Sequence, residues 1–264
     1  MRFAGTKRTF VAALCGLAIG SLAWSQQLAP RTIHVFVALA DNQHQGIVPV
    51  PARLGNGDDP ESNLYWGSAY GVKTFFRRSA EWVMTNCIAK PKPEVLERCV
   101  FKHRETNTYL VADAYRGSEI REAILDFFDA ASGANPEIVA TPQSGQPLTI
   151  RGGSNLVAYV GHDGLMDFSL PLIPKQKNEI LRDAIILACA SKQYFSESLR
   201  PGGAHPLLWT TNLMAPEAYT LKSALEGWIA GENSEQIRDR AAVAYDKYQK
   251  CGVRAARRLF VSGW

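Results

Sequence analysis

The sequence predicts an α/β fold, a three-layer sandwich in which a mainly parallel sheet is flanked by helices. Two apolar runs, at 156–160 and 184–188, are too short for ordinary helices and are rich in residues that suit buried strands. Strand-like runs also alternate with helical patterns along the chain, which is typical of a parallel sheet. The two runs lead to His162 and Cys189, and open α/β sheets place their chemistry at the carboxyl ends of strands.

The first 150 residues supply the elements that precede this central pair. Apolar runs bounded by turn residues indicate strands, and apolar residues at mixed helical spacing indicate helices. Ser118 is expected to cap a helix that ends before Gly133. The predicted elements are a strand at 32–40, a helix at 64–87, a strand or short helix at 95–104, a strand at 108–114, a helix at 118–131 and a short strand at 148–150.

The last third of the chain completes the sandwich. Asn233 is a favourable cap for the longer of its two predicted helices. No internal repeat and no second domain with its own composition is visible. The predicted elements are a helical turn or two at 175–182, a strand at 206–211, a helix at 216–230, a helix at 234–250 and an edge strand at 258–261.

The amino terminus has the pattern of an export signal. Three basic residues precede an apolar run at 10–24, and residues 23–25 (AWS) have the small-x-small form of a signal-peptidase site. We therefore expect residues 1–25 to be removed and residues 26–264 to form a single domain in the periplasm or the extracellular space. No later run reaches the roughly 18 apolar residues that span a bilayer, so no membrane association is expected after signal removal.

Composition narrows the class of partner. The chain has 264 residues, of which 46% are hydrophobic and 20% charged, as is ordinary for a globular protein. Loss of the three basic residues of the signal would lower the formal charge from +4 to +1. A nearly neutral chain without a block of Lys or Arg gives no reason to expect nucleic acid. A peptide or protein substrate remains compatible with it.

Four cysteines remain after signal removal, in a compartment where disulfides persist. Cys87 and Cys99 lie close in sequence on either side of a Pro-rich turn and could close a loop. Cys189 and Cys251 then have two possibilities. They could form a second disulfide, which would leave no nucleophile, or Cys189 could stay free as a reactive thiol.

A thiol and an imidazole at neighbouring strand ends suit nucleophilic catalysis. The thiolate attacks a carbonyl carbon, while the imidazole takes up and returns the proton. Glycines beside His162 allow a sharp turn and expose a backbone amide that could stabilise an oxyanion. Cys189 as nucleophile and His162 as base therefore form the candidate dyad.

An apolar strand that ends in a His–Gly pair, followed by an apolar strand that ends in Ala-Cys, resembles the caspase, legumain, clostripain and gingipain group of cysteine peptidases. The resemblance implies a caspase-like fold and an exported cysteine endopeptidase that needs no cofactor and no metal. The family usually has Gly directly after the catalytic His, whereas this chain has Asp163 there and Gly164 one residue later. Asp163 is then either the former of a turn or a residue that orients the site, and amides near Gly164 and Cys189 would hold the oxyanion.

The same resemblance suggests a substrate pocket. If the topology holds, Asp41 and Asp113 end neighbouring strands near the dyad, and an acidic pocket floor would favour Lys or Arg before the cut, as in the gingipain-like and clostripain-like members. Trp209 could line the cleft or pack in the core.

Other chemistries have less support. The sequence contains no HExxH, GxSxG, P-loop or GxGxxG motif. The loop at 56–60 (NGDDP) could wrap a Ca²⁺ ion or be a plain turn-rich loop, and its spacing matches no EF-hand. The alternative to a peptidase is an exported non-catalytic binding or scaffold domain of the same fold, with Cys189 in a disulfide or a degenerate site. A hydrolase that uses the same thiol on another acyl substrate is a third interpretation.

Overall fold

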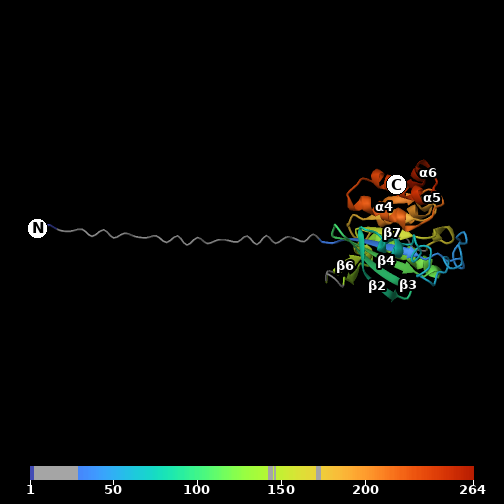
Figure 1. The fold of residues 1–264 in the computed structure, drawn as a ribbon, viewed down its shortest axis with the longest axis horizontal. Coiled ribbons are helices and arrows are strands. Elements are labelled where there is room, and N and C mark those ends of the chain that lie inside the picture. Colours follow the sequence, from blue (N-terminus) through green and yellow to red (C-terminus); the bar gives the residue numbers. More distant parts are fainter. Residues whose placement is uncertain (3–28, 142–144, 146, 171–173) are drawn as a thin grey trace.

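The structure is a computed structural model that describes residues 1–2, 29–141, 145, 147–170 and 174–264. All but the first two residues of the predicted export signal lie outside the described part. From residue 29 onward the chain folds around one large sheet with helices on both sides (Figure 1).

The large sheet has eight strands in the order β10-β9-β8-β7-β1-β4-β3-β2. Its five central strands, from β9 to β4 in this order, run parallel, which confirms the predicted mainly parallel sheet. Antiparallel strands close both edges: the β2–β3 hairpin on one side and β10 on the other. The strands of this sheet are β1 (Arg31–Ala38), β2 (Trp82–Lys92), β3 (Val95–His103), β4 (Thr108–Tyr115), β7 (Leu156–Val160), β8 (Asp183–Leu187), β9 (His205–Thr210) and β10 (Phe260–Val261).

Helices cover both faces of the sheet, so the central strands are apolar on both sides. One face packs against α1, α4, α5 and α6, and the other against α2 and α3. The helices are α1 (Val72–Arg77), α2 (Ile120–Ser132), α3 (Ser191–Gly202), α4 (Ala218–Ile229), α5 (Ser234–Gln249) and α6 (Val253–Leu259). A separate hairpin of β5 (Glu137–Ala140) and β6 (Pro147–Ile150) lies beside the sheet, and η1 (Gly117–Glu119), η2 (Arg151–Gly153) and η3 (Gly164–Met166) are short 3-10 turns.

The predicted central strands and the last long helix are confirmed. The runs at 156–160 and 184–188 correspond to β7 and β8, which pair in parallel. Asn233 caps α5 with a full capping box: its side chain accepts from the Gln236 amide, and the Gln236 side chain accepts from the Asn233 amide.

The predicted helix at 64–87 is wrong over most of its length. Only Val72–Arg77 is helical, and Trp82–Lys92 forms strand β2 instead. Aromatic and β-branched residues suit a strand, and pairing with β3 satisfies the backbone that a longer helix would have satisfied internally. The Pro-rich turn is thus a hairpin turn, and the segment 95–104 is a strand.

Three further helix predictions need correction. Ser118 lies within η1, and α2 begins at Ile120 without a side-chain cap, although Gly133 ends it in the left-handed conformation as expected. Residues 175–182 contain no helix. Helix α3 was not predicted because Pro201 and the glycines beside it indicated a loop, yet Pro201 lies in the last turn of that helix.

The structure shows which of the four cysteines are paired. Cys87 and Cys99 face each other in the β2–β3 register and form a disulfide, so the bridge joins two strands rather than closing a loop after a helix. Cys189 and Cys251 are both free. The alternative that pairs Cys189 with Cys251 is therefore not realised here.

No helix within the described residues combines the length and apolar character that crossing a bilayer requires.

Candidate active site

The sheet brings His162 and Cys189 to its carboxyl edge in matching positions. The last residues paired between β7 and β8 are Val160 and Leu187. His162 lies two residues after Val160 in the chain, and Cys189 lies two residues after Leu187. The Gly161 amide continues the pairing by donating to the Leu187 carbonyl at 3.2 Å. Neighbouring strands are about 4.8 Å apart, so the two side chains leave adjacent strand ends in the same register.

Both residues line one cavity of about 350 Å³. Its walls come from the segments that follow β1, β7, β8 and β9, all at the carboxyl edge where α/β sheets bind ligands. Three apolar side chains that line it, Val48, Met166 and Leu213, are also exposed to solvent. The lining residues are Gly46, Ile47, Val48, Val50, Leu64, Tyr65, Gly161, His162, Met166, Cys189, Leu213, Met214, Ala215, Pro216 and Glu217.

His162 is held at both its ring and its backbone. Its Nε2 lies 2.7 Å from Oδ2 of Asp167, and its carbonyl accepts a hydrogen bond of 2.7 Å from the Tyr159 hydroxyl. An Nε2–H that donates to a carboxylate leaves Nδ1 of the neutral ring as the proton acceptor. In a neutral ring the arrangement favours the tautomer that carries its proton on Nε2.

Asp167 is a site residue that the sequence reasoning missed. Its Oδ2 also accepts from the Gly46 amide at 3.1 Å, so this carboxylate ties the segment after β1 to the candidate base. The available signal was an acidic residue five positions after His162, just beyond the glycine turn. The spacing alone does not predict a contact, because the contact depends on the turn at η3, which brings the Asp167 carboxylate back to the His162 ring.

Cys189 lies partly buried on a sharp strand-to-helix turn. The next residue, Ala190, is in the left-handed conformation (φ 46°), and α3 starts immediately after it. A non-glycine residue at positive φ is costly and is often found at functional sites. The turn presents the sulfur at the sheet edge, in the manner of a nucleophile held between a strand and a helix.

The thiol is protonated at rest near neutral pH. Burial raises the pKa of Cys189, the backbone hydrogen bond with Met214 lowers it, and the charge of Asp163 raises it further. The Met214 amide donates to Sγ at 3.4 Å. Formation of the thiolate would therefore need a base, and His162 is the histidine that lines the same cavity.

Two backbone amides were expected near the oxyanion, and the structure separates them. The Gly164 amide donates to the His162 carbonyl at 3.1 Å and is engaged in the turn. The Cys189 amide has no hydrogen-bond acceptor among the described residues. Of the two, the Cys189 amide is the one left to bind an oxyanion.

Asp163 forms the turn, as one of its two interpretations predicted. Its Oδ1 accepts from the Leu165 amide at 3.0 Å and caps η3. The residue is completely buried, and its Oδ2 has no hydrogen-bond partner among the described residues. Its backbone carbonyl accepts from the Met166 amide at 3.1 Å, which completes the turn.

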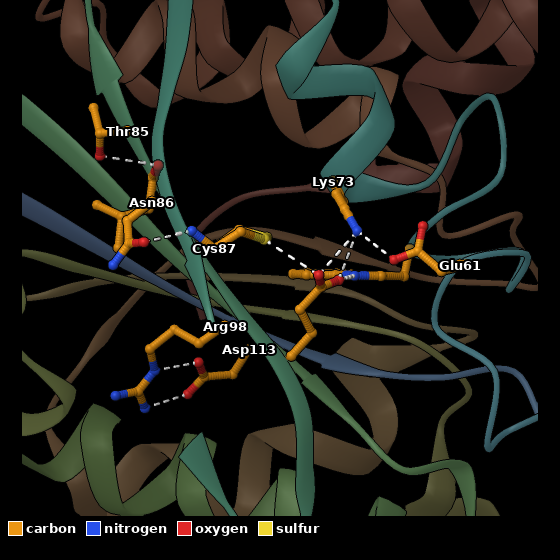
Figure 2. Close-up of a disulfide and its surroundings, with 11 residues drawn as sticks. Glu61, Lys73, Thr85, Asn86, Cys87, Arg98 and Asp113 are labelled. Carbon is orange, nitrogen blue, oxygen red and sulfur yellow. Dashed lines mark hydrogen bonds and ion pairs between the residues drawn. A yellow bond between two sulfur atoms is a disulfide. The ribbon is translucent and has the colours of Figure 1, made fainter. Parts of the chain in front are cut away.

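The structure places Asp113 away from the cavity, so it cannot form a pocket floor. It is fully buried, and its two carboxylate oxygens accept from Arg98 at 2.6 and 2.7 Å (Figure 2). Oδ2 also lies 3.1 Å from Nε2 of His34. Burial alone would raise the pKa of Asp113, but these hydrogen bonds outweigh it and hold the pKa below its ordinary value.

Asp41 and Trp209 are also absent from the lining of the dyad cavity. Asp41 lines a different, polar cavity, where its carboxylate accepts from the His44 backbone and lies 2.8 Å from the His44 ring. Trp209 is fully buried in the core against Trp264, which supports the packing alternative. Glu217 is the acidic residue that does line the dyad cavity, and sequence reasoning missed it because it directly precedes α4.

The loop at 56–60 does not gather ligands for an ion. Asp58 pairs with Arg116, and Asp59 accepts from the amide of Glu61. Within the described residues, one cluster brings three potential metal ligands together, namely Cys87, Glu97 and Cys99. The two cysteines of this cluster are joined in the disulfide.

Comparisons with protein-family models, with curated proteins and with solved structures returned no match to this chain.

Proposed function

We propose that the protein is an exported cysteine endopeptidase with a caspase-like fold, in which Cys189 is the nucleophile and His162 the general base. The observation that carries the proposal is the register: the two residues extend adjacent parallel strands by the same number of positions and line one cavity. The hydrogen bond between Asp167 and Nε2 of His162 supports it, because it leaves Nδ1 free to receive a proton.

The reaction follows from these positions. Nδ1 of His162 takes the proton of the Cys189 thiol as the sulfur attacks the scissile carbonyl carbon, and the Cys189 amide stabilises the resulting oxyanion. The imidazolium returns that proton to the leaving amine as the C–N bond breaks, which leaves an acyl group on the sulfur. Water, deprotonated by His162, then attacks the thioester and releases a carboxylic acid and the free thiol.

The cavity suggests what the acyl portion carries. Its walls are mostly aliphatic, and Glu217 adds a carboxylate that accepts a 2.8 Å hydrogen bond from Tyr219. A side chain with an apolar stem and a basic end would complement both features.

The test is hydrolysis of a fluorogenic peptide library by the mature protein and two matched variants. Cys189→Ala should abolish hydrolysis, whereas Cys251→Ala, which removes the other free thiol, should leave it unchanged. Circular dichroism and thermal unfolding check that both variants stay folded. Hydrolysis that persists in Cys189→Ala would sink the assignment.

A second readout needs no substrate. Iodoacetamide labelling followed by mass spectrometry should modify Cys189 in a manner that depends on His162, with a slower rate in His162→Ala. If Cys189 labels at the same rate in both proteins and no peptide is cut, the non-catalytic binding domain of the same fold becomes the better interpretation.

A further inference from the structure

The disulfide between β2 and β3 has a carboxylate beside it. Cys87 and Cys99 face each other in the strand register, and Oε1 of Glu97 lies 3.4 Å from Sγ of Cys87 (Figure 2). One ligand atom from each of these three residues lies within 4.8 Å of the other two. Two sulfurs and a carboxylate oxygen are donors that thiophilic divalent cations such as Zn²⁺ take in proteins.

The spacing of these atoms suits a tetrahedral ion. Bonds of about 2.3 Å to sulfur and about 2.1 Å to oxygen set the ligand atoms of a tetrahedral zinc site about 3.6 Å apart. The 3.4 Å between Sγ of Cys87 and Oε1 of Glu97 is close to that separation. Once the S–S bond is broken, repulsion moves the two sulfurs to van der Waals contact, which is nearly the same separation again.

Glu97 is already oriented to act as a ligand. Its side chain is only 14% exposed, and its carboxylate accepts from Nε1 of Trp66 at 2.6 Å and from Nζ of Lys73 at 2.9 and 3.0 Å. Hydrogen bonds of this kind hold metal-ligating carboxylates in place. Two thiolates and Glu97 bring three negative charges into a largely buried site, and a divalent cation together with the Lys73 ammonium balances them.

The cluster is accessible and separate from the candidate dyad. Cys99 is fully buried, whereas Cys87 is partly exposed, so a reductant and an ion reach the cluster at Cys87. Cys87, Glu97 and Cys99 are not among the residues that line the cavity of Cys189. An inference about this cluster is therefore independent of the proposed function.

We propose that Cys87, Cys99 and Glu97 form a redox-controlled site for a thiophilic divalent cation, with Zn²⁺ as the best match. Two electrons and two protons from a reductant, such as a dithiol that becomes its own disulfide, convert the bridge into two thiols. The cation then displaces both thiol protons and binds the two sulfurs and the carboxylate. The disulfide and the metal are thus alternative cross-links between β2 and β3, and each excludes the other.

The test is a titration with Co²⁺, a spectroscopic substitute for Zn²⁺. The mature chain is reduced with a phosphine and separated from it without oxygen, and it carries Cys189→Ala and Cys251→Ala so that no other thiol binds the probe. Binding should produce the thiolate-to-cobalt charge-transfer band and the strong d–d bands of a tetrahedral site, and Zn²⁺ should remove them. The oxidised chain should show neither. Absence of these bands from the reduced chain would refute the site.

Two carboxylates provide a matched comparison. Glu97 and Glu61 both pair with Lys73, but only Glu97 belongs to the cluster with the sulfurs. Glu97→Gln should weaken Zn²⁺ binding roughly tenfold in competition with a chromophoric chelator, whereas Glu61→Gln should leave it unchanged. Cys99→Ser should abolish binding at the same metal concentration. An affinity that is unchanged in Cys99→Ser, or equal in the two Glu variants, overturns the proposal.

The unsubstituted protein gives a second test in case a variant does not fold. After reduction, Zn²⁺ should slow the alkylation of Cys87 by iodoacetamide, as mass spectrometry measures, because the metal holds the sulfur as a bound thiolate. Alkylation of the exposed Cys251 serves as the internal reference and should not change. Equal labelling of Cys87 with and without Zn²⁺ overturns the site, whatever the result of the peptide hydrolysis assay.

Discussion

Asp167→Asn is the perturbation that tests whether the two candidate catalytic residues work with a third side chain. The carboxylate lies 2.7 Å from Nε2 of His162 and also accepts from the Gly46 amide. Asn retains the shape and one acceptor oxygen but removes the charge that stabilises the imidazolium. The ring is then less firmly fixed in the tautomer that leaves Nδ1 free to take a proton.

The size of the effect follows from the exposure of the two partners. A hydrogen bond to a charged group contributes about 1.5 to 3 kcal/mol. The side chain of His162 is 8% exposed but that of Asp167 is 40% exposed, so water screens part of the interaction. A loss of about 1.5 to 2 kcal/mol in the transition state corresponds to a roughly 10- to 30-fold decrease in rate.

The assay is kcat/KM on a peptide from the library, together with the rate of Cys189 alkylation. Asp239→Asn is the matched control, because its side chain is 43% exposed and paired with Arg257 away from the cavity. A double-mutant cycle gives the decisive readout: in a His162→Ala background, Asp167→Asn should have no further effect. If Asp167→Asn matches the control, or lowers the rate equally without His162, Asp167 does not act through the imidazole.

Three other predictions concern stability. Asp113→Asn should lower the free energy of unfolding by about 3 kcal/mol in urea titrations, because it removes the buried carboxylate of Arg98 and leaves this guanidinium its pair with the less buried Glu137; an unchanged midpoint would contradict this. The same pair should fail in acid. Since the folded-state pKa of Asp113 lies below its ordinary value of 3.8, its contribution is present above that pH and is lost as the pH falls further. Burial lowers the pKa of His34 below its ordinary 6.5, so the unfolded chain takes up this proton before the folded chain does, and stability should begin to fall as the pH drops below 6.5. Reduction of the Cys87–Cys99 bridge, which spans 12 residues, should cost about 3 kcal/mol of stability while the Cys189 alkylation rate stays the same, as paired measurements with and without dithiothreitol can establish.

The parts of the fold that could be predicted are those whose cause is local. The runs at 156–160 and 184–188 are apolar throughout because helices cover both faces, and that pattern is visible in the sequence. The capping box at Asn233 is equally local. Residues 82–87 fall within the predicted helix because the apolar spacing there is ambiguous, and only pairing with β3 across the sheet makes them part of a strand.

The residues of the candidate site also differ in whether their cause is local. His162 and Cys189 could be predicted because each lies within two residues of the end of an apolar run, and the parallel pairing of the two strands brings these ends to the same edge of the sheet. The acidic pocket residues could not be found in this way. Asp113 and Asp41 also end predicted strands, but Asp113 meets Arg98 on a neighbouring strand, and Asp41 turns back onto His44. A charged residue at the end of a strand is therefore a poor indicator of a binding pocket when a neighbouring side chain already pairs with it.

The connection between β7 and β8 explains why the site has a supporting shell that the sequence did not reveal. A parallel crossover usually contains a helix, and such a helix would carry the chain away from the carboxyl edge. In the described part of this connection the only helical element is η3, a single 3-10 turn capped by Asp163. The chain therefore folds back on the strand end and returns Asp167 to the ring of His162. Asp163 and Asp167, the two carboxylates of this segment, are therefore both positioned by one short turn, so residues 161–168 matter to the candidate site as much as His162 and Cys189 do.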